Sequence, residues 1–86
     1  MEYDKDKVDE MTLALMYLVS FTDKPGMRAW KGFDWDTLDR LCDKGCISAP
    51  KGKARSVWLS EEGTRLSKEL FWKHFGTQGD SPSEQA

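Results

Sequence analysis

The sequence has few of the residues from which metal and redox sites are built. It contains two cysteines, Cys42 and Cys46, and one histidine, His74. Two cysteines form no disulfide framework, and a zinc site takes about four ligands, so one chain falls short unless two chains share a site. We therefore expect no metal and no cofactor, and we interpret Cys42 as a core residue.

Catalytic motifs are missing as well. The sequence has no glycine-rich phosphate loop, no Gly-x-Ser-x-Gly and no His-Glu-x-x-His. Its carboxylates are scattered over predicted helix surfaces, where charged residues are expected because water solvates them. We predict that the protein is not an enzyme.

Long apolar runs are also absent. The longest, over 13–19, has seven residues, against about 18 for a membrane span. The chain starts Met-Glu-Tyr-Asp, which is acidic where a secretory signal is basic. Together with the few cysteines, these features predict a cytoplasmic protein that has no membrane partner.

What the sequence does contain suits one small domain. Its 86 residues are 38% hydrophobic and 33% charged, which is ordinary for a globular protein. Residues 77–86 carry no large apolar side chain. We therefore predict a single domain over 1–76 and a disordered tail over 77–86.

Apolar spacing and capping residues predict three helices. The first spans 7–21 with Asp6 as its N-cap, and the second spans 35–44 between Asp34 and Gly45. The third begins after Ser60 and ends at Gly76.

The first helix is unusually apolar. Its stripe is Val8, Met11, Leu15 and Leu18, but residues 13–19 are apolar nearly all round. Such a helix is central to its domain or packs on a second subunit. We name Leu13, Met16 and Tyr17 as candidate interface residues of a homodimer.

The segments between the helices predict one β-hairpin. Ile47 starts a short strand, residues 49–53 form a turn, and residues 56–59 form the second strand. Pro25 and Gly26 mark another turn within 22–33, with room for a short helical turn over 27–31. The fold class is therefore α+β, mostly helical, with about three helices and one hairpin.

Residues 38–70 resemble the C-terminal half of a winged-helix domain of the multiple-antibiotic-resistance-regulator type. Two motifs carry the resemblance, Asp-Lys-Gly-Cys-Ile at 43–47 and Leu-Ser-Glu-Glu-Gly at 59–63. The resemblance implies a trimmed winged-helix-like domain, because no room is left for the helix that precedes a recognition helix. The helix that matches the recognition helix begins at Asp34 and continues through Asp36, Asp39 and Asp43, and these four carboxylates would meet DNA phosphates.

Residues 1 to about 76 also resemble a family of small bacterial proteins known only as a domain of unknown function. The main motif is Arg-Ala-Trp-Lys-Gly-Phe-Asp-Trp-Asp at 28–36, followed by Leu-Asp-Arg-Leu at 38–41. Further matches are Lys-Ala-Arg-Ser-Val at 53–57 and Lys-His-Phe-Gly at 73–76. The resemblance implies a bacterial origin and brings no activity or site residues.

Two groups of side chains are candidates for a functional site. The first is basic and lies around the predicted hairpin: Lys44, Lys51, Lys53 and Arg55. It is suited to contact a nucleic-acid backbone, and the alternative is a solvated turn that protects an edge strand.

The second group is aromatic. Trp30, Phe33 and Trp35 alternate with Arg28 and Lys31, a pattern that stacks bases or binds a peptide. Large aromatic residues in a small domain more often build the core, and we expect core packing here, with an interface or a ligand as alternatives. The tryptophans that are candidate interface residues are Trp30, Trp58 and Trp72.

Together these features favour a non-catalytic regulatory or protein-interaction module that forms a homodimer through its first helix. The alternative is a winged-helix DNA-binding protein that contacts the backbone through the basic hairpin 44–55. The acidic second helix disfavours nucleic acid, so the expected partner is a second copy or another protein.

Overall fold

The computed structural model describes residues 2–77. Three helices and a three-stranded antiparallel sheet form an α+β fold, as predicted. In chain order the elements are α1 (Lys5–Leu18), β1 (Ser20–Asp23), β2 (Gly26–Trp30), α2 (Trp35–Asp43), β3 (Ser56–Leu59) and α3 (Glu61–Phe75). Apart from Thr77, the predicted tail lies outside the described residues.

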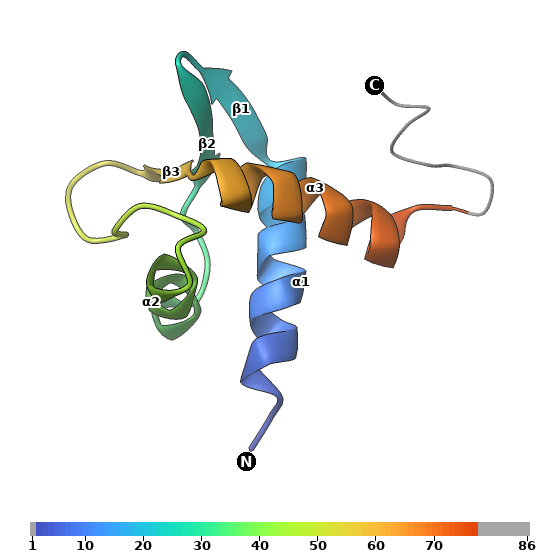
Figure 1. Cartoon of the computed structure of the whole chain (residues 1–86). Coiled ribbons are helices and arrows are strands. Elements are labelled where there is room, and N and C mark those ends of the chain that lie inside the picture. The colour runs from blue at the N-terminus through green and yellow to red at the C-terminus, as the bar shows by residue number, and fades with distance from the viewer. Residues whose placement is uncertain (1, 78–86) are drawn as a thin grey trace.

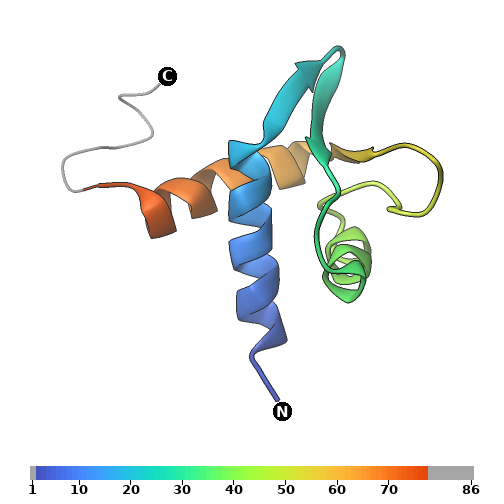
Figure 2. The same cartoon turned by 180° about the vertical axis from the view of Figure 1, so that it is seen from behind.

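The helices α1 and α3 cross near the C-terminal half of α1, and α2 lies to one side of α1 (Figure 1). The β1–β2 hairpin rises from the C-terminal end of α1, and the view from behind shows the same arrangement (Figure 2). The predicted packing of the first helix against the third is therefore confirmed. Within residues 2–77 we find no helix of the length and apolarity that a membrane crossing requires.

Local capping explains where the helices begin and end. The Asp4 side chain, and not the predicted Asp6, caps α1 by accepting a bond from the Lys7 N–H at 3.0 Å. Because α1 ends at Leu18, residues 20 and 21 belong to β1 and not to the predicted helix. Gly45 follows α2 with a φ of 78°, as its predicted role at the helix end requires.

Helix α3 has the predicted cap and a close backbone contact in its first turn. The Ser60 hydroxyl accepts a bond from the Gly63 N–H at 2.9 Å. A Cβ added at Gly63 would overlap the carbonyl oxygen of Cys46. Glycine at this position therefore lets the first turn of α3 lie directly on the backbone that follows α2.

The sheet differs from the prediction. β2 is its central strand and pairs antiparallel with β1 and β3, so the expected helical turn over 27–31 is wrong. The strand over 56–59 is confirmed with its bounds. At Ile47 the predicted strand shrinks to a single bridge with Leu59.

The core lies between the inner face of the sheet and the three helices. It is formed by small and medium-sized side chains from every element except β1: Leu13, Ala14, Met16, Ala29, Leu38, Leu41, Cys46, Ile47, Val57, Leu59 and Leu70. None of the four tryptophans is among these buried residues.

Candidate functional site

The strand register places large side chains on the face of the sheet that is turned away from the core. Arg28 in β2 lies opposite Phe21 in β1 and Trp58 in β3, so the three residues form a row across the sheet. The Arg28 guanidinium lies 4.4 Å from the centre of the Trp58 ring. Two residues further along β2, Trp30 packs on Phe21 with 5.2 Å between ring centroids. We call Phe21, Arg28, Trp30 and Trp58 the outer-face cluster.

The tryptophans of this region face solvent. Trp30 is 53% exposed, Trp58 is 36% exposed and the nearby Trp35 is 58% exposed. Phe33 is partly buried and packs against the core. The expectation of core packing for Trp30, Phe33 and Trp35 is therefore right for Phe33 and wrong for the two tryptophans.

Arg28 is held firmly within the cluster. Its Nε donates to the Ser56 hydroxyl at 2.7 Å, and a terminal guanidinium nitrogen donates to the Ser56 carbonyl oxygen at 2.9 Å. The Asp23 carboxylate lies 3.9 Å from Nε. Arg28 therefore acts as a support for the Trp58 ring, because these two hydrogen bonds hold its guanidinium against that ring.

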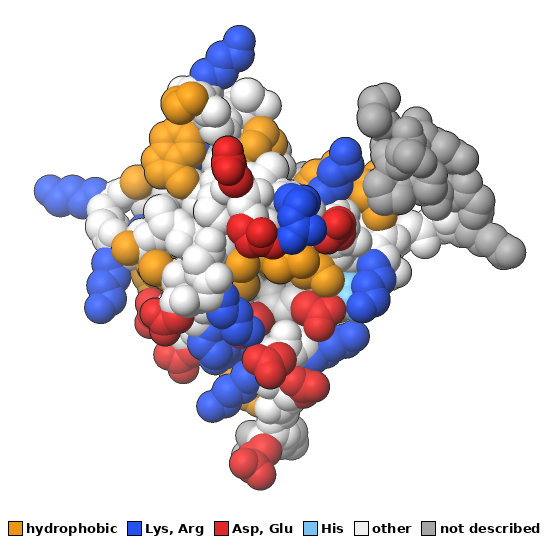
Figure 3. Space-filling view, in the orientation of Figure 1, with side chains coloured by type: hydrophobic (Ala, Val, Ile, Leu, Met, Phe, Trp, Pro, Cys, Tyr) orange, Lys and Arg blue, Asp and Glu red, His pale blue; other side chains and the backbone are white. Residues whose placement is uncertain are grey.

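A loop with exposed cations adjoins the cluster, and we call residues 50–55 the basic loop. The Lys31 ammonium fastens this loop by donating to the carbonyl oxygens of Pro50 at 2.6 Å and Gly52 at 3.2 Å. Its exposed cationic side chains are Lys51, Lys53 and Arg55. Figure 3 shows Lys and Arg side chains projecting where the loop before β3 lies, with hydrophobic side chains nearby over the β-hairpin.

The structure separates Lys44 from the other predicted basic residues. Its ammonium donates to Asp9 at 2.8 Å and to Asp6 at 3.1 Å, which joins the end of α2 to α1. Three of the four predicted nucleic-acid contacts therefore lie together, while Lys44 is occupied within the fold.

Asp9 is the centre of this ion cluster and is only 2% exposed. Its burial opposes ionisation, but hydrogen bonds from Arg40 and Lys44 outweigh that effect and lower the pKa of Asp9. The hydrogen bond to Asp9 in turn raises the pKa of Lys44. These charges connect α1 to α2, so we assign them a structural role.

The exposed side of α2 is acidic. Asp36, Asp39 and Asp43 are all exposed, at the helix that the winged-helix resemblance would place in a DNA groove. Like charges on phosphates and carboxylates repel each other. The geometry thus gives no support to duplex recognition by α2.

The predicted interface residues of α1 are divided between two faces. Leu13 and Met16 are fully buried within the chain, which leaves them unable to contact a second copy of the folded protein. Tyr17 is half-buried and packs on Phe71 at 5.3 Å between ring centroids. The apolar residues that face solvent are instead Leu15, Leu18 and Val19, at 39%, 63% and 38% exposure.

Trp72, another candidate interface residue, is neither fully buried nor well exposed. It is half-buried and meets Phe71 edge-on at 5.4 Å between ring centroids. Its indole N–H is buried without a hydrogen-bond partner among residues 2–77. Trp72 therefore presents little surface for an interface.

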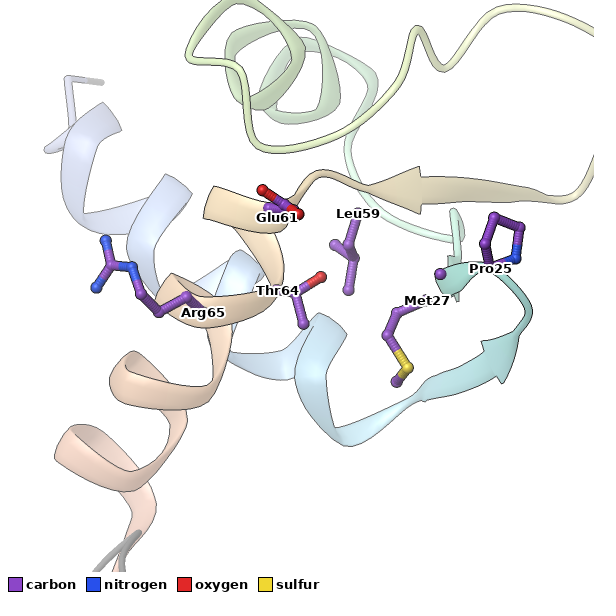
Figure 4. A pocket seen from close by; sticks show the side chains of 7 residues that line it. Pro25, Met27, Leu59, Glu61, Thr64 and Arg65 are labelled. Carbon is purple, nitrogen blue, oxygen red and sulfur yellow. The ribbon is translucent and has the colours of Figure 1, made fainter. Parts of the chain in front are cut away.

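The structure also has an open groove that the sequence did not predict. It has a volume of about 370 Å³ and lies between the β1–β2 turn and the first turns of α3 (Figure 4). Met27 and Leu59 form an apolar floor, and Glu61 and Arg65 stand at its rim. Arg65 is occupied by ion pairs with Glu62 and Glu69, so the groove offers few free polar groups to a ligand.

The remaining candidates for chemistry are tied into the fold. His74 lies 3.0 Å from the Glu10 carboxylate, which lowers the pKa of Glu10. Burial raises the pKa of the Cys46 thiol, and Cys42 is half-buried against the core. The described part of the chain holds no group of three or more side chains placed to bind a metal.

Comparisons with known proteins agree with the resemblance to a bacterial family. Residues 4–77 match the family described as "Domain of unknown function (DUF6429)". The uncharacterized protein y4hR of the bacterium Sinorhizobium fredii is 47% identical over 75 residues, which cover 87% of this chain and 97% of that relative. No solved structure matches the chain, so the winged-helix resemblance stays a prediction. Both matches span most of the sequence, and the chain therefore belongs to the DUF6429 family.

Proposed function

We propose that this protein is a non-catalytic interaction module that works as a homodimer, paired through the outer side of α1. The observation that carries the proposal is an apolar stripe on the side of α1 away from the core. Its members are Val8 and Met11, which are half-buried, and Leu15 and Leu18, which are 39% and 63% exposed. A surface helix normally turns such a stripe inward, so a second molecule is the natural cover for it.

The spacing of the stripe favours a second helix as that cover. Its residues are separated by three, four and three positions, which is the repeat of a coiled-coil seam. The buried side of α1 carries Asp9, Leu13 and Met16. Packing within the chain and pairing with a second copy therefore use different residues. A second copy of α1 offers a matching seam without any further element.

The charges on α1 favour an antiparallel pair. Lys5 and Lys7 lie in the first turn, where the helix dipole disfavours cations, and the last turn has no basic residue. In an antiparallel pair, the lysines of one copy lie beside the C-terminal carbonyls of the other. Each helix then supplies the cations that the other one lacks.

A non-catalytic role is supported by the state of the reactive side chains. The buried Asp9 is neutralised by Arg40 and Lys44, and the Cys46 thiol is buried with a raised pKa. A thiol of this kind is a poor nucleophile. The cytoplasmic location that the sequence predicts stays a prediction.

The test is the molar mass in solution, measured by light scattering over a series of protein concentrations. We expect the mass to rise from 9.9 kDa toward twice that value as concentration increases. Leu18→Lys should stay monomeric, because it places a charge in the seam. Phe75→Lys is the matched control, since Phe75 is also an exposed apolar residue (41%) but lies at the end of α3. A native protein that stays monomeric at millimolar concentration would refute the proposal.

The orientation of the pair has its own test. Antiparallel pairing places Val8 of one copy near Leu18 of the other, so a mixture of Val8→Cys and Leu18→Cys chains should form a disulfide-linked heterodimer. Each variant alone should not cross-link, and the native chain controls for Cys42 and Cys46. Self-cross-linking of Leu18→Cys would show a parallel pair instead.

A further inference from the structure

The outer-face cluster and the basic loop form one continuous surface. Trp30 lies opposite Ser56, the residue that follows the basic loop. The Lys31 N–H donates to the Arg55 carbonyl oxygen at 3.0 Å, which fixes the end of β2 beside the loop. Exposed aromatic rings and exposed cations are therefore neighbours at this end of the sheet.

We infer that this surface binds single-stranded nucleic acid, with bases stacked on Trp30 and Trp58 and phosphates beside the cations of the basic loop. This inference rests on the proposed role as a binding module, but it does not depend on the pairing of α1.

The two tryptophans are placed as a stacking platform. Trp58 lies opposite Arg28, two residues from Trp30, so the two residues are diagonal neighbours about 7–8 Å apart at their backbones. Each ring is already supported on one side, Trp58 by Arg28 and Trp30 by Phe21. Supported rings lose little freedom when a base stacks on them, and antiparallel sheets with exposed aromatic residues are a recurrent platform for unpaired bases.

The charge distribution favours an anionic ligand at this side of the molecule. Residues 20–33 and 48–60 contain six Lys or Arg and one Asp, while the rest of the chain contains seven Lys or Arg and fourteen Asp or Glu. The chain is therefore net negative overall although its sheet side is net positive. A polyanion is steered toward the sheet side and away from the helical side.

A single strand fits these observations better than a duplex or an acidic protein. Stacking on Trp30 and Trp58 needs bases that are not paired inside a helix. The element that would have to enter a major groove is α2, and its exposed residues are acidic. An acidic peptide would satisfy the cations but would leave the two indoles without planar partners.

Binding can be measured by fluorescence anisotropy with the full chain and a fluorescein-labelled, mixed-sequence oligonucleotide at low salt. The probes are the DNA single strand, the RNA single strand of the same sequence and the DNA duplex, with polyglutamate as competitor. We expect saturable binding of the single strands, weaker binding of the duplex, and quenching of tryptophan fluorescence on binding. The ratio of the two single-strand affinities shows whether RNA or DNA is the preferred source of the ligand.

Substitutions separate stacking from charge. Trp30→Ala and Trp58→Ala should each weaken single-strand binding about tenfold. Lys51→Glu with Lys53→Glu should weaken binding and lower the slope of log affinity against log salt by about 1.4. The matched control is Lys68→Glu with Lys73→Glu, the same charge change on α3. Trp58→Leu replaces Trp58→Ala if circular dichroism shows that the alanine variant does not fold.

Three results would overturn the inference. They are duplex binding at least as tight as single-strand binding, tryptophan variants with native affinity, and displacement by polyglutamate at equal charge concentration. The last result would point to an acidic protein partner. Light scattering of the native chain keeps the tests distinct, because a native chain that is monomeric but still binds the single strands would refute only the α1 pairing.

Discussion

The two faces of β2 invert the usual relation between side-chain size and burial. Its inner face carries Met27 and Ala29, and its outer face carries Arg28 and Trp30. Across β3 the contrast repeats, because Val57 is 2% exposed while its neighbour Trp58 is 36% exposed. The small residues let α1 and α3 approach the sheet closely, and the large ones remain on the surface.

Helix α1 shows the same inversion in charge. Its inner face includes Asp9 at 2% exposure, and its outer face includes Leu18 at 63% exposure. Burial on both elements is thus decided by which neighbour covers a face, so that Trp30 and Leu18 stay exposed although they are large and apolar. The predictions below test this contrast between inner and outer faces.

The largest difference is expected between two leucines of α1. Leu13→Ala should lower the free energy of unfolding by about 3 kcal/mol, because it opens a cavity in the core. Leu15→Ala should lower it by less than about 1 kcal/mol, because Leu15 is 39% exposed. Urea unfolding of both variants at low protein concentration measures the two losses in free energy of unfolding. Equal losses would mean that the outer face of α1 is covered within the monomer.

Replacement of the buried carboxylate comes next. Asp9→Asn should cost about 2 kcal/mol at neutral pH, below the usual cost of breaking a buried pair because Arg40 and Lys44 are partly exposed. The folded-state pKa of Asp9 is lowered, so its contribution is complete above its unfolded pKa near 3.9 and is lost as pH falls through the lower folded value.

The pH dependence makes this prediction specific. Native and Asp9→Asn proteins should therefore differ less in stability at acidic pH than at pH 7, which denaturant unfolding at both values measures. A difference that does not change with pH would show that Asp9 acts through packing alone.

The smallest difference is expected within β3. Val57→Ala should cost about 2 kcal/mol through loss of core contacts. Trp58→Ala should cost about 1 kcal/mol, mainly its contact with Arg28, although it removes a far larger side chain. Thermal unfolding followed by circular dichroism compares the two. A larger loss for Trp58→Ala would show that the outer-face cluster stabilises the fold more than its exposure suggests.

The sequence predicted those features that depend only on residues close together in the chain, such as the ends of helices. Asp34, Gly45 and Ser60 gave the bounds of α2 and the start of α3 because capping acts over three or four residues. The family resemblance was also recognisable from contiguous motifs, and the comparisons confirm it.

The β1–β2 hairpin was missed because its alternation is hidden. Met27 and Ala29 face inward, but the outward positions hold Phe21 and Trp30, so apolar residues occupy both faces. The signal that would find it is the Pro25–Gly26 turn between two short segments of mixed apolar residues. Phe21 was not recognised as a site residue for the same reason.

Long-range partners were also beyond the sequence. Lys44 meets Asp9, 35 positions away, so its removal from the predicted basic set depends on how α1 and α2 pack. Which face of α1 is buried also depends on long-range packing. A helix that is apolar nearly all round gives no signal for the face that is covered. The candidate site was therefore half predictable: the cations of the loop and two exposed tryptophans, but not their common platform.

The contact between Gly63 and Cys46 changes what the Leu-Ser-Glu-Glu-Gly motif signifies in this chain. Ser60 starts the helix, the acidic pair sits at the positive end of its dipole, and glycine allows the turn to lie on the preceding backbone. The serine, the acidic pair and the glycine of the motif thus each meet a structural requirement where β3 is joined to α3. In this chain the motif therefore describes how β3 is joined to α3, and it carries no information about a ligand.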